Sequence, residues 1–161
     1  MMLEVRSKAT TCRLSLISGL VVILCLSACT SVQPSIANDT EQTSKNSSKI
    51  KQSLTTANAA QGKRLYLQCR ACHSLEAGGI NTVGPNLHGL FGSAAGQAEG
   101  FNYSDVLLES GVVWTPKTLD KWLARPSDFL PGNRMIFAGV SDPADRADLI
   151  LYLLQATGPA D

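Results

Sequence analysis

The chain has 161 residues, which is enough for one ordinary domain and one additional segment. Its 14 Lys and Arg and 13 Asp and Glu leave a formal charge of +1, so the composition gives no sign of a nucleic-acid partner. Glycines number 13 and aromatic residues are few, which fits a small loop-rich fold better than a long helical bundle. The five cysteines form two groups, and this odd number argues against a disulfide framework.

The N-terminal 28 residues have the pattern of an export signal. Basic residues precede an apolar run over residues 14–28. The run of about 15 residues is shorter than the ~20 that a membrane-spanning helix needs. It ends in Leu26-Ser27-Ala28-Cys29, which resembles the bacterial lipobox, whose cysteine is acylated and becomes the new N-terminus. We therefore expect a signal peptide over residues 1–28 and a lipid anchor on Cys29. Ordinary secretion with cleavage elsewhere, or an uncleaved short anchor, are the alternatives.

Residues 29–55 are rich in Ser, Thr, Asn and Gln and have almost no large apolar residues. Such a segment cannot bury enough apolar surface to fold, so we expect a flexible linker. The anchor places the protein on the periplasmic side of a bacterial membrane. Thr30 after the candidate lipidated cysteine weakly resembles outer-membrane sorting, whereas a respiratory role favours the inner membrane, and the choice of membrane stays open.

The folded domain is predicted over residues 56–161, and we expect it to be all-α. A glycine-rich stretch over residues 78–100 separates the first predicted helix from the others. Pro116 suits the first turn of a helix, while Asp142 and Gly158 suit the start and the end of the last one. The predicted helices cover residues 57–70, 104–109, 116–124 and 143–156.

The strongest motif is Cys69-Arg70-Ala71-Cys72-His73, the C-x-x-C-H pattern of covalent haem attachment. In this chemistry the two thiols form thioethers with the haem vinyl groups, and the adjacent histidine is the proximal iron ligand. A thioredoxin-like pair would need a βαβ pattern nearby, which the sequence lacks. A zinc site would need four ligands, and His88 is the only further nitrogen donor. The motif therefore favours one covalent haem c.

A sixth iron ligand is available in Met135, the only methionine after the signal segment. It follows Pro131-Gly132-Asn133-Arg134, a turn-rich loop that could deliver a thioether to the far haem face. A histidine and methionine pair raises the reduction potential, which suits an electron carrier. A lone methionine can also be core filler. His88 is the rival ligand, although a partly exposed side chain is its simpler interpretation.

From Gly62 to Leu154 the chain resembles class I cytochromes c of the mitochondrial and bacterial c2 type. The resemblance implies a small all-α fold of three to five helices around one covalently bound haem, with crossed N- and C-terminal helices. It also implies a one-electron carrier and not an enzyme. The matching segments are Gly84-Pro85-Asn86-Leu87-His88-Gly89-Leu90-Phe91-Gly92, Gly100-Phe101-Asn102-Tyr103-Ser104, Trp114-Thr115, Thr118-Leu119, Trp122-Leu123, Pro131-Gly132-Asn133-Arg134-Met135-Ile136-Phe137-Ala138-Gly139 and Arg146-Ala147-Asp148-Leu149-Ile150.

The resemblance assigns roles around the haem. Met135 would be the axial sulfur ligand opposite His73, and the Pro85 carbonyl would accept a hydrogen bond from the His73 ring. Tyr103 and Trp114 would donate to a buried haem propionate.

Two further residues of the site are implied at its rim. Asn133 would lie near the methionine loop, and Phe137 would cover the exposed haem edge. The crossing of the terminal helices would bring together Gly62, Tyr66, Leu149 and Tyr152, where glycine permits close backbone approach.

The sequence departs from the family pattern at several positions. Ser93 stands where many members have an arginine near the propionates, and Trp122 replaces the usual tyrosine near the methionine. Positions that are often basic at the haem edge hold Gln68, Ser127 and Asp128. From residue 56 onward there are 8 Lys and Arg and 10 Asp and Glu, a formal charge of −2. We therefore do not expect steering by positive charge, and tethering would raise the effective concentration instead.

The sequence thus predicts a monomeric, lipid-anchored, single-haem electron carrier that binds no nucleic acid. Its expected donor is a quinol–cytochrome c oxidoreductase and its expected acceptor a terminal oxidase. A gas-binding, sensor or peroxidase-like module is the first alternative, and it would require a labile or absent sixth ligand. A fixed electron-transfer subunit of a larger enzyme is the second.

Overall fold

The structure is a computed structural model and describes residues 48–158. The expected signal peptide, the candidate lipidation site Cys29 and most of the expected linker lie outside the described residues. Within residues 48–158, no helix has both the length and the apolar character needed to cross a membrane.

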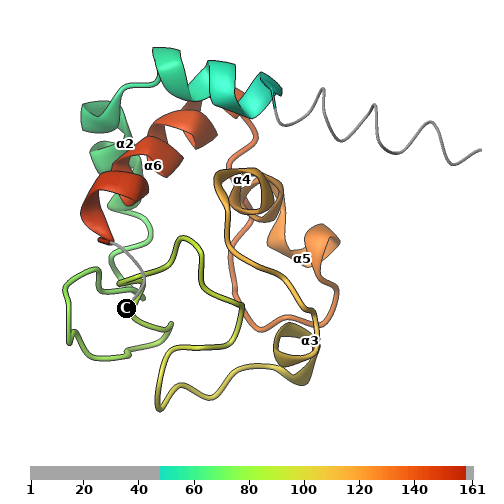
Figure 1. Ribbon diagram of the computed structural model, residues 1–161. Coiled ribbons are helices and arrows are strands. Elements are labelled where there is room, and N and C mark those ends of the chain that lie inside the picture. Colours follow the sequence, from blue (N-terminus) through green and yellow to red (C-terminus); the bar gives the residue numbers. More distant parts are fainter. Residues whose placement is uncertain (1–47, 159–161) are drawn as a thin grey trace, which may run out of the picture. The chain divides into compact units, whose positions relative to one another are not determined.

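The described part of the chain is helical, and the expected all-α fold class is confirmed. Figure 1 shows the helices connected by long irregular segments. Residues 48–56 are also helical. Between residues 48 and 158, β pairing is limited to one isolated antiparallel bridge, which joins Ala94 and Val113. The helices are α2 (Ala59–Tyr66), α3 (Asp105–Leu108), α4 (Pro116–Ala124), α5 (Pro126–Phe129) and α6 (Pro143–Ala156).

Helices α4 and α6 have the predicted bounds because their start signals are strong. The Thr115 side chain accepts a hydrogen bond from the Thr118 backbone, and the Thr118 side chain caps the Thr115 backbone in return. Pro116 occupies the first turn of α4. The Asp142 carboxylate accepts from the Ala144 amide at the start of α6.

The other helices differ from the predicted ones in detail. Helix α2 ends at Tyr66, and residues 67–70 continue as turns rather than as helix. Helix α5 was not predicted. It is a single turn that starts at Pro126, whose fixed φ suits the first helical position.

Residues 48–55 form a helix, which differs from the flexible linker expected there. Ile50 and Leu54 are four positions apart and therefore share one helix face. Both are partly buried against the core of the domain. The polar composition of residues 29–55 did not reveal this pair, because two apolar residues change the mean hydropathy of the segment little. The folded unit therefore begins before residue 56.

Asn58 lies between the helix over residues 48–56 and α2, and it connects the start of α2 to α6. Its side chain accepts from the amides of Ala60 and Gln61, which caps α2. Its own amide donates to the Asp148 carboxylate over 2.7 Å. The start of α2 is thus fixed against α6.

Helices α2 and α6 cross in close contact, as the sequence predicts (Figure 1). A Cβ atom at Gly62 would clash with the Asp148 carbonyl and would lie 2.8 Å from the Tyr152 Cβ. The Tyr66 and Tyr152 rings are in contact in a tilted arrangement, with a centroid distance of 5.6 Å and an interplanar angle of 46°. Glycine at position 62 is therefore required for the two backbones to approach.

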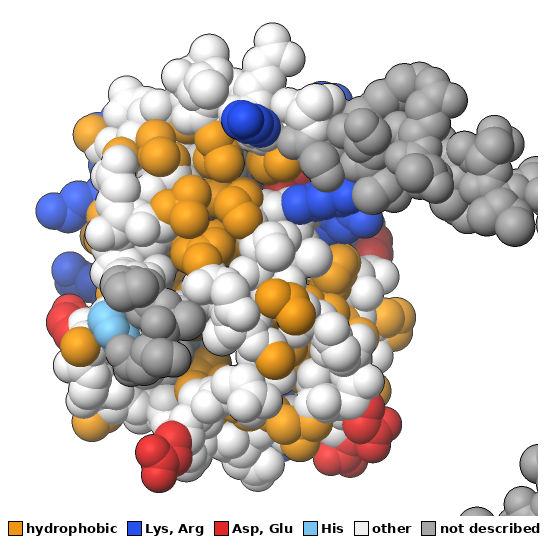
Figure 2. All heavy atoms as spheres, in the orientation of Figure 1, with side chains coloured by type: hydrophobic (Ala, Val, Ile, Leu, Met, Phe, Trp, Pro, Cys, Tyr) orange, Lys and Arg blue, Asp and Glu red, His pale blue; other side chains and the backbone are white. Residues whose placement is uncertain are grey.

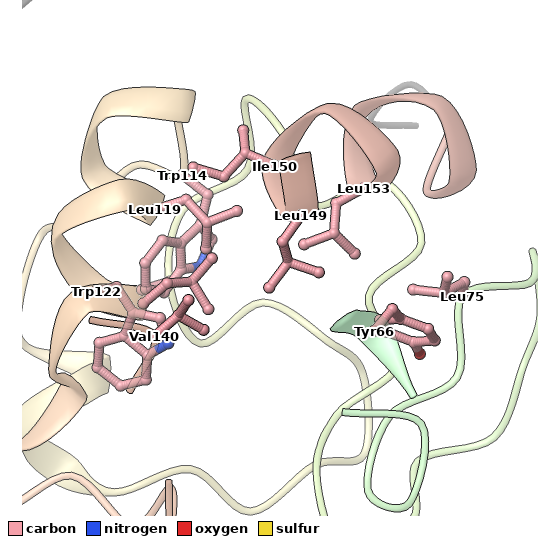
Figure 3. Packing of buried hydrophobic residues seen from close by; sticks show 11 residues of the cluster. Tyr66, Leu75, Trp114, Leu119, Trp122, Val140, Leu149, Ile150 and Leu153 are labelled. Carbon is pink, nitrogen blue, oxygen red and sulfur yellow. The ribbon is translucent and has the colours of Figure 1, made fainter. Parts of the chain in front are cut away.

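The hydrophobic core lies between α6 and the α4 segment (Figure 3). Leu149 and Ile150 of α6 are fully buried, and Trp114 and Trp122 pack edge to face at a centroid distance of 5.5 Å. An ion pair reinforces this contact, because Arg146 Nε donates to the Asp120 carboxylate over 2.6 Å. Figure 2 shows one face of the domain, where hydrophobic side chains gather in the middle and charged ones lie mainly toward the rim.

Candidate functional site

A cavity of about 600 Å³ lies beside this core. It falls within the range of about 300–1,000 Å³ that is usual for ligand cavities. Tyr66, Trp122 and Leu149 line it from α2, α4 and α6, and Figure 3 shows these three side chains around a common space. The pentapeptide cysteines and histidine and the predicted sulfur ligand line the same cavity: Cys69, Cys72, His73 and Met135.

The turns that follow α2 place the pentapeptide at the cavity. The Cys69 amide donates to the Tyr66 carbonyl over 2.8 Å, and the His73 amide donates to the Cys69 carbonyl over 3.0 Å. These helix-like bonds bring Cys69, Cys72 and His73 to the cavity wall together. Both cysteines are free and half-buried.

The Cys69 thiol is protonated at neutral pH. Burial, followed by the nearby Cys72, raises the pKa of Cys69 to about 11. A thioredoxin-like redox cysteine has a lowered pKa, because its thiolate is the nucleophile. The surroundings of Cys69 therefore do not favour the thioredoxin-like alternative.

His73 is held in the orientation that the resemblance implies. Its Nδ1 lies 2.7 Å from the Pro85 carbonyl oxygen, which leaves Nε2 as the nitrogen that can bind a metal. Burial lowers the pKa of His73, while the hydrogen bond to Pro85 opposes this shift, so the ring is neutral at pH 7. A Cβ at Gly84 would clash with the ring, so glycine there leaves room for His73.

Met135 reaches the cavity from an irregular loop over residues 131–139. The Met135 amide donates to the Asn133 side-chain oxygen over 2.9 Å. The Asn133 side-chain nitrogen donates to the carbonyls of Pro126 and Leu130 over 2.9 and 2.8 Å. Asn133 therefore ties the Met135 loop to α5, which agrees with its expected place near the methionine.

The remaining predicted site residues form cavity walls. Tyr103, Trp114 and Phe137 line the cavity, together with Ser93. Burial raises the pKa of Tyr103, and its hydroxyl accepts from the Ala98 amide over 3.2 Å. The Ser93 hydroxyl donates to the Leu90 carbonyl over 2.7 Å. The expected contacts of Tyr103 and Trp114 with a propionate stay predictions.

Some apolar side chains at the cavity are exposed. Ile136 is fully exposed, and Val83 is 79% exposed, although both line the cavity. The exposed residues at the cavity therefore include these apolar side chains beside polar ones such as Gln68 and the charged Arg134. The described lining contains no lysine, in keeping with the missing lysine ring that the sequence already indicated.

Comparison with known proteins identifies the family. The family model described as Cytochrome c matches residues 59–157. The chain belongs to the cytochrome c family. It is 48% identical over 99 residues to a cytochrome c of Chlamydomonas reinhardtii, covering 61% of this chain and 88% of that protein. It is 45% identical over 97 residues to a cytochrome c2 of Blastochloris viridis, covering 60% and 76%. It is 44% identical over 105 residues to a cytochrome c homolog of Bradyrhizobium diazoefficiens, covering 65% and 57%.

Cytochromes c carry one covalently bound haem and transfer electrons without acting as enzymes, so this chain is a haem electron carrier. The cavity fits that cofactor. It offers two thiols, a neutral imidazole and a thioether, and aromatic side chains complete an apolar wall. Sulfur and imidazole donors suit iron, and the thiol spacing matches thioether attachment.

His88 lines the same cavity as Met135, so both candidate axial ligands are brought to the site. The His88 ring lies beside the end of α6, because a Cβ at Gly158 would be 2.8 Å from its Cε1 atom. The His88 amide donates to the Asn86 side chain over 2.8 Å.

Two contributors to the site were missed by sequence reasoning. The Tyr66 hydroxyl donates to the His73 carbonyl over 2.7 Å, although Tyr66 was expected only to pack in the helix crossing. The Arg134 guanidinium donates to carbonyls of Asn102 and Tyr103. The position of Arg134 next to Met135 was visible in the sequence, but its partners are 32 and 31 residues away.

Proposed function

We propose that this cytochrome c is a membrane-tethered one-electron carrier in which Cys69 and Cys72 hold the haem and His73 and Met135 are the axial ligands. One observation carries the site assignment. The side chains of the pentapeptide and of a distant irregular loop line one cavity that has apolar and aromatic walls.

The protein groups have separate tasks in this proposal. When bound, the haem supplies an iron that takes up and releases one electron. The two cysteines fix its position covalently, and the Pro85 carbonyl holds the His73 ring in its ligating tautomer. Asn133 holds the loop that delivers the Met135 thioether. Because the chain itself would fill both axial positions, no position is left for a substrate.

The proposed tether rests on the N-terminal sequence. The signal pattern over residues 1–28 and the lipobox-like Cys29 support export and lipid attachment on the periplasmic side of a bacterial membrane. Lipid chains on one residue anchor a protein in proportion to the CH₂ groups they bury. Because residues 48–56 are helical, with Ile50 and Leu54 packed on the domain, these residues are not part of the proposed flexible tether.

The proposed partners are a quinol–cytochrome c oxidoreductase as donor and a terminal oxidase as acceptor, which a monomer would visit in turn. The described lining of the cavity holds no lysine and a single arginine, which supports partners that do not select this protein by a ring of lysines. Tethering near the membrane raises the effective concentration of such partners without electrostatic steering.

The ligand assignment is tested by the optical spectrum of the oxidised, haem-loaded full-length protein. Methionine bound to ferric haem iron gives a weak charge-transfer band in the red. Met135→Ala should abolish this band, while the matched variant His88→Ala should retain it. Persistence of the band in Met135→Ala, or its absence from the unaltered protein, would refute the assignment of Met135.

A further inference from the structure

Arg134 differs in charge from the other side chains around the cavity. Among the described residues that line the cavity, it is the only Lys, Arg, Asp or Glu. The residue is exposed, so water alone would satisfy its donors. It instead contacts residues that lie 32 and 31 positions earlier in the chain.

The contacts of Arg134 converge on residues 102–103. Its Nη2 donates to the Asn102 carbonyl over 3.1 Å and also to the Tyr103 carbonyl. The Asn102 side-chain oxygen lies 3.4 Å from the same nitrogen. Hydrogen bonds from a charged guanidinium are stronger than those from neutral donors. The guanidinium therefore joins two segments that are distant in the sequence.

The loop over residues 131–139 needs such a tie, because it contains neither helix nor strand. The hydrogen bonds of Asn133 fasten it only to neighbouring residues of α5 and the segment after it. Arg134 fastens the same loop to residues 102–103, which are remote in the chain.

Residues 98–103 form a compact partner for this tie. The Phe101 amide donates to the Ala98 carbonyl over 3.3 Å, and the Ala98 amide donates to the Tyr103 hydroxyl. The Phe101 and Tyr103 rings meet edge to face at a centroid distance of 4.8 Å. Gly132 also brings the loop close to α3, since a Cβ there would be 3.3 Å from a Val106 methyl.

We propose that Arg134 is a positioning residue that latches the Met135 loop onto residues 102–103 and thereby limits replacement of Met135 by an external ligand. The inference rests on the proposed function, in which Met135 is an axial ligand. A ligand on a loop can be displaced only when the loop moves, and local opening depends on the contacts that must break. Loss of a charge-assisted tie should make opening about tenfold more frequent.

The test measures how fast imidazole displaces the thioether in the oxidised, haem-loaded full-length protein. The loss of the red methionine-to-iron band reports each exchange. Arg134→Leu removes the charge and the donors without placing a second thioether beside Met135, and it should exchange about tenfold faster. Arg134→Lys keeps the charge but loses the planar donor fork, so its rate should be intermediate.

Arg125→Leu is the matched control. Arg125 pairs with Asp128 over 3.3 Å in the neighbouring α5 and does not line the cavity. Its loss removes one cation without cutting the tie to residues 102–103, so the exchange rate should stay at the unaltered value. Denaturant midpoints of the two leucine variants should be similar, because the latch acts locally.

Equal exchange rates in Arg134→Leu and Arg125→Leu would overturn the latch. A fall in the denaturant midpoint large enough to account for the whole acceleration would also overturn it, because Arg134 would then act on global stability. If the unaltered protein lacks the red band, the proposed ligation by Met135 fails and the latch fails with it. If the unaltered protein has the red band but the exchange rates differ from those expected, the latch proposal is wrong and the assignment of Met135 stands.

Discussion

The Tyr66 hydroxyl donates a hydrogen bond to the His73 carbonyl oxygen over 2.7 Å. This bond joins the helix crossing to the haem-attachment segment, because the Tyr66 ring also packs against Tyr152 of α6. The Tyr66 side chain therefore links the packing of α2 against α6 to the backbone of His73.

Tyr66→Phe should lower the free energy of unfolding by about 1 kcal/mol, since it leaves the His73 carbonyl without that donor. Tyr152→Phe is the matched control, because it removes a hydroxyl from the other ring of the same aromatic pair. Denaturant titration of both haem-loaded variants measures the difference. An equal loss in the two variants would show that the bond to His73 contributes nothing specific.

The helix over residues 48–56 should stabilise the domain through its apolar face. Ile50→Ala and Leu54→Ala should each lower the free energy of unfolding by about 1–2 kcal/mol, because both side chains are only partly buried. Gln52→Ala changes an exposed residue of the same helix and should have little effect. If all three variants unfold at the same denaturant concentration, this helix does not contribute to the stability of the core.

The pH dependence of stability should report Tyr103. Burial raises the pKa of Tyr103 above its ordinary value of 10.0, so folding favours the neutral phenol. Its stabilising contribution is complete below pH 10 and declines as the pH rises through the raised pKa of the folded protein. Unfolding titrations at increasing alkaline pH should therefore show a steeper loss in the unaltered protein than in Tyr103→Phe. Parallel losses would contradict this role.

The proposed tether makes a prediction about membrane association. When the full-length gene product is expressed in a bacterium that acylates lipoproteins, the protein should sediment with membranes. Cys29→Ser should move it to the soluble fraction, because the acyl chains are then absent. Cys25→Ser is the matched control and should remain with the membranes. Membrane association that survives Cys29→Ser would refute lipidation at this position.

Much of the fold was predictable because its signals are local. Pro116 and Asp142 mark the starts of α4 and α6 with side chains that act on their own neighbours. The Cys69-Arg70-Ala71-Cys72-His73 pentapeptide is equally local, since its function depends on spacing alone. The family resemblance supplied the pairing of Pro85 with His73, and in the structure the His73 Nδ1 atom lies 2.7 Å from the Pro85 carbonyl oxygen.

The remainder depends on contacts between distant residues. The bond between Arg134 and Tyr103 spans 31 positions, and nothing about an arginine in a turn-rich loop indicates such a partner. Ile50 and Leu54 fold onto the core because a helix face finds an apolar surface there, whereas average composition predicted a linker. Tertiary packing therefore determined the structure of these segments, which local composition did not predict.

Carbon monoxide binding tests the closed axial site most directly. The reduced, haem-loaded full-length protein would be exposed to carbon monoxide while its optical spectrum is recorded. If His73 and Met135 occupy both axial positions, the spectrum should stay unchanged. Rapid conversion to a carbon monoxide spectrum would show that one axial position is open, which would contradict a closed electron carrier and favour a gas-binding or sensor module.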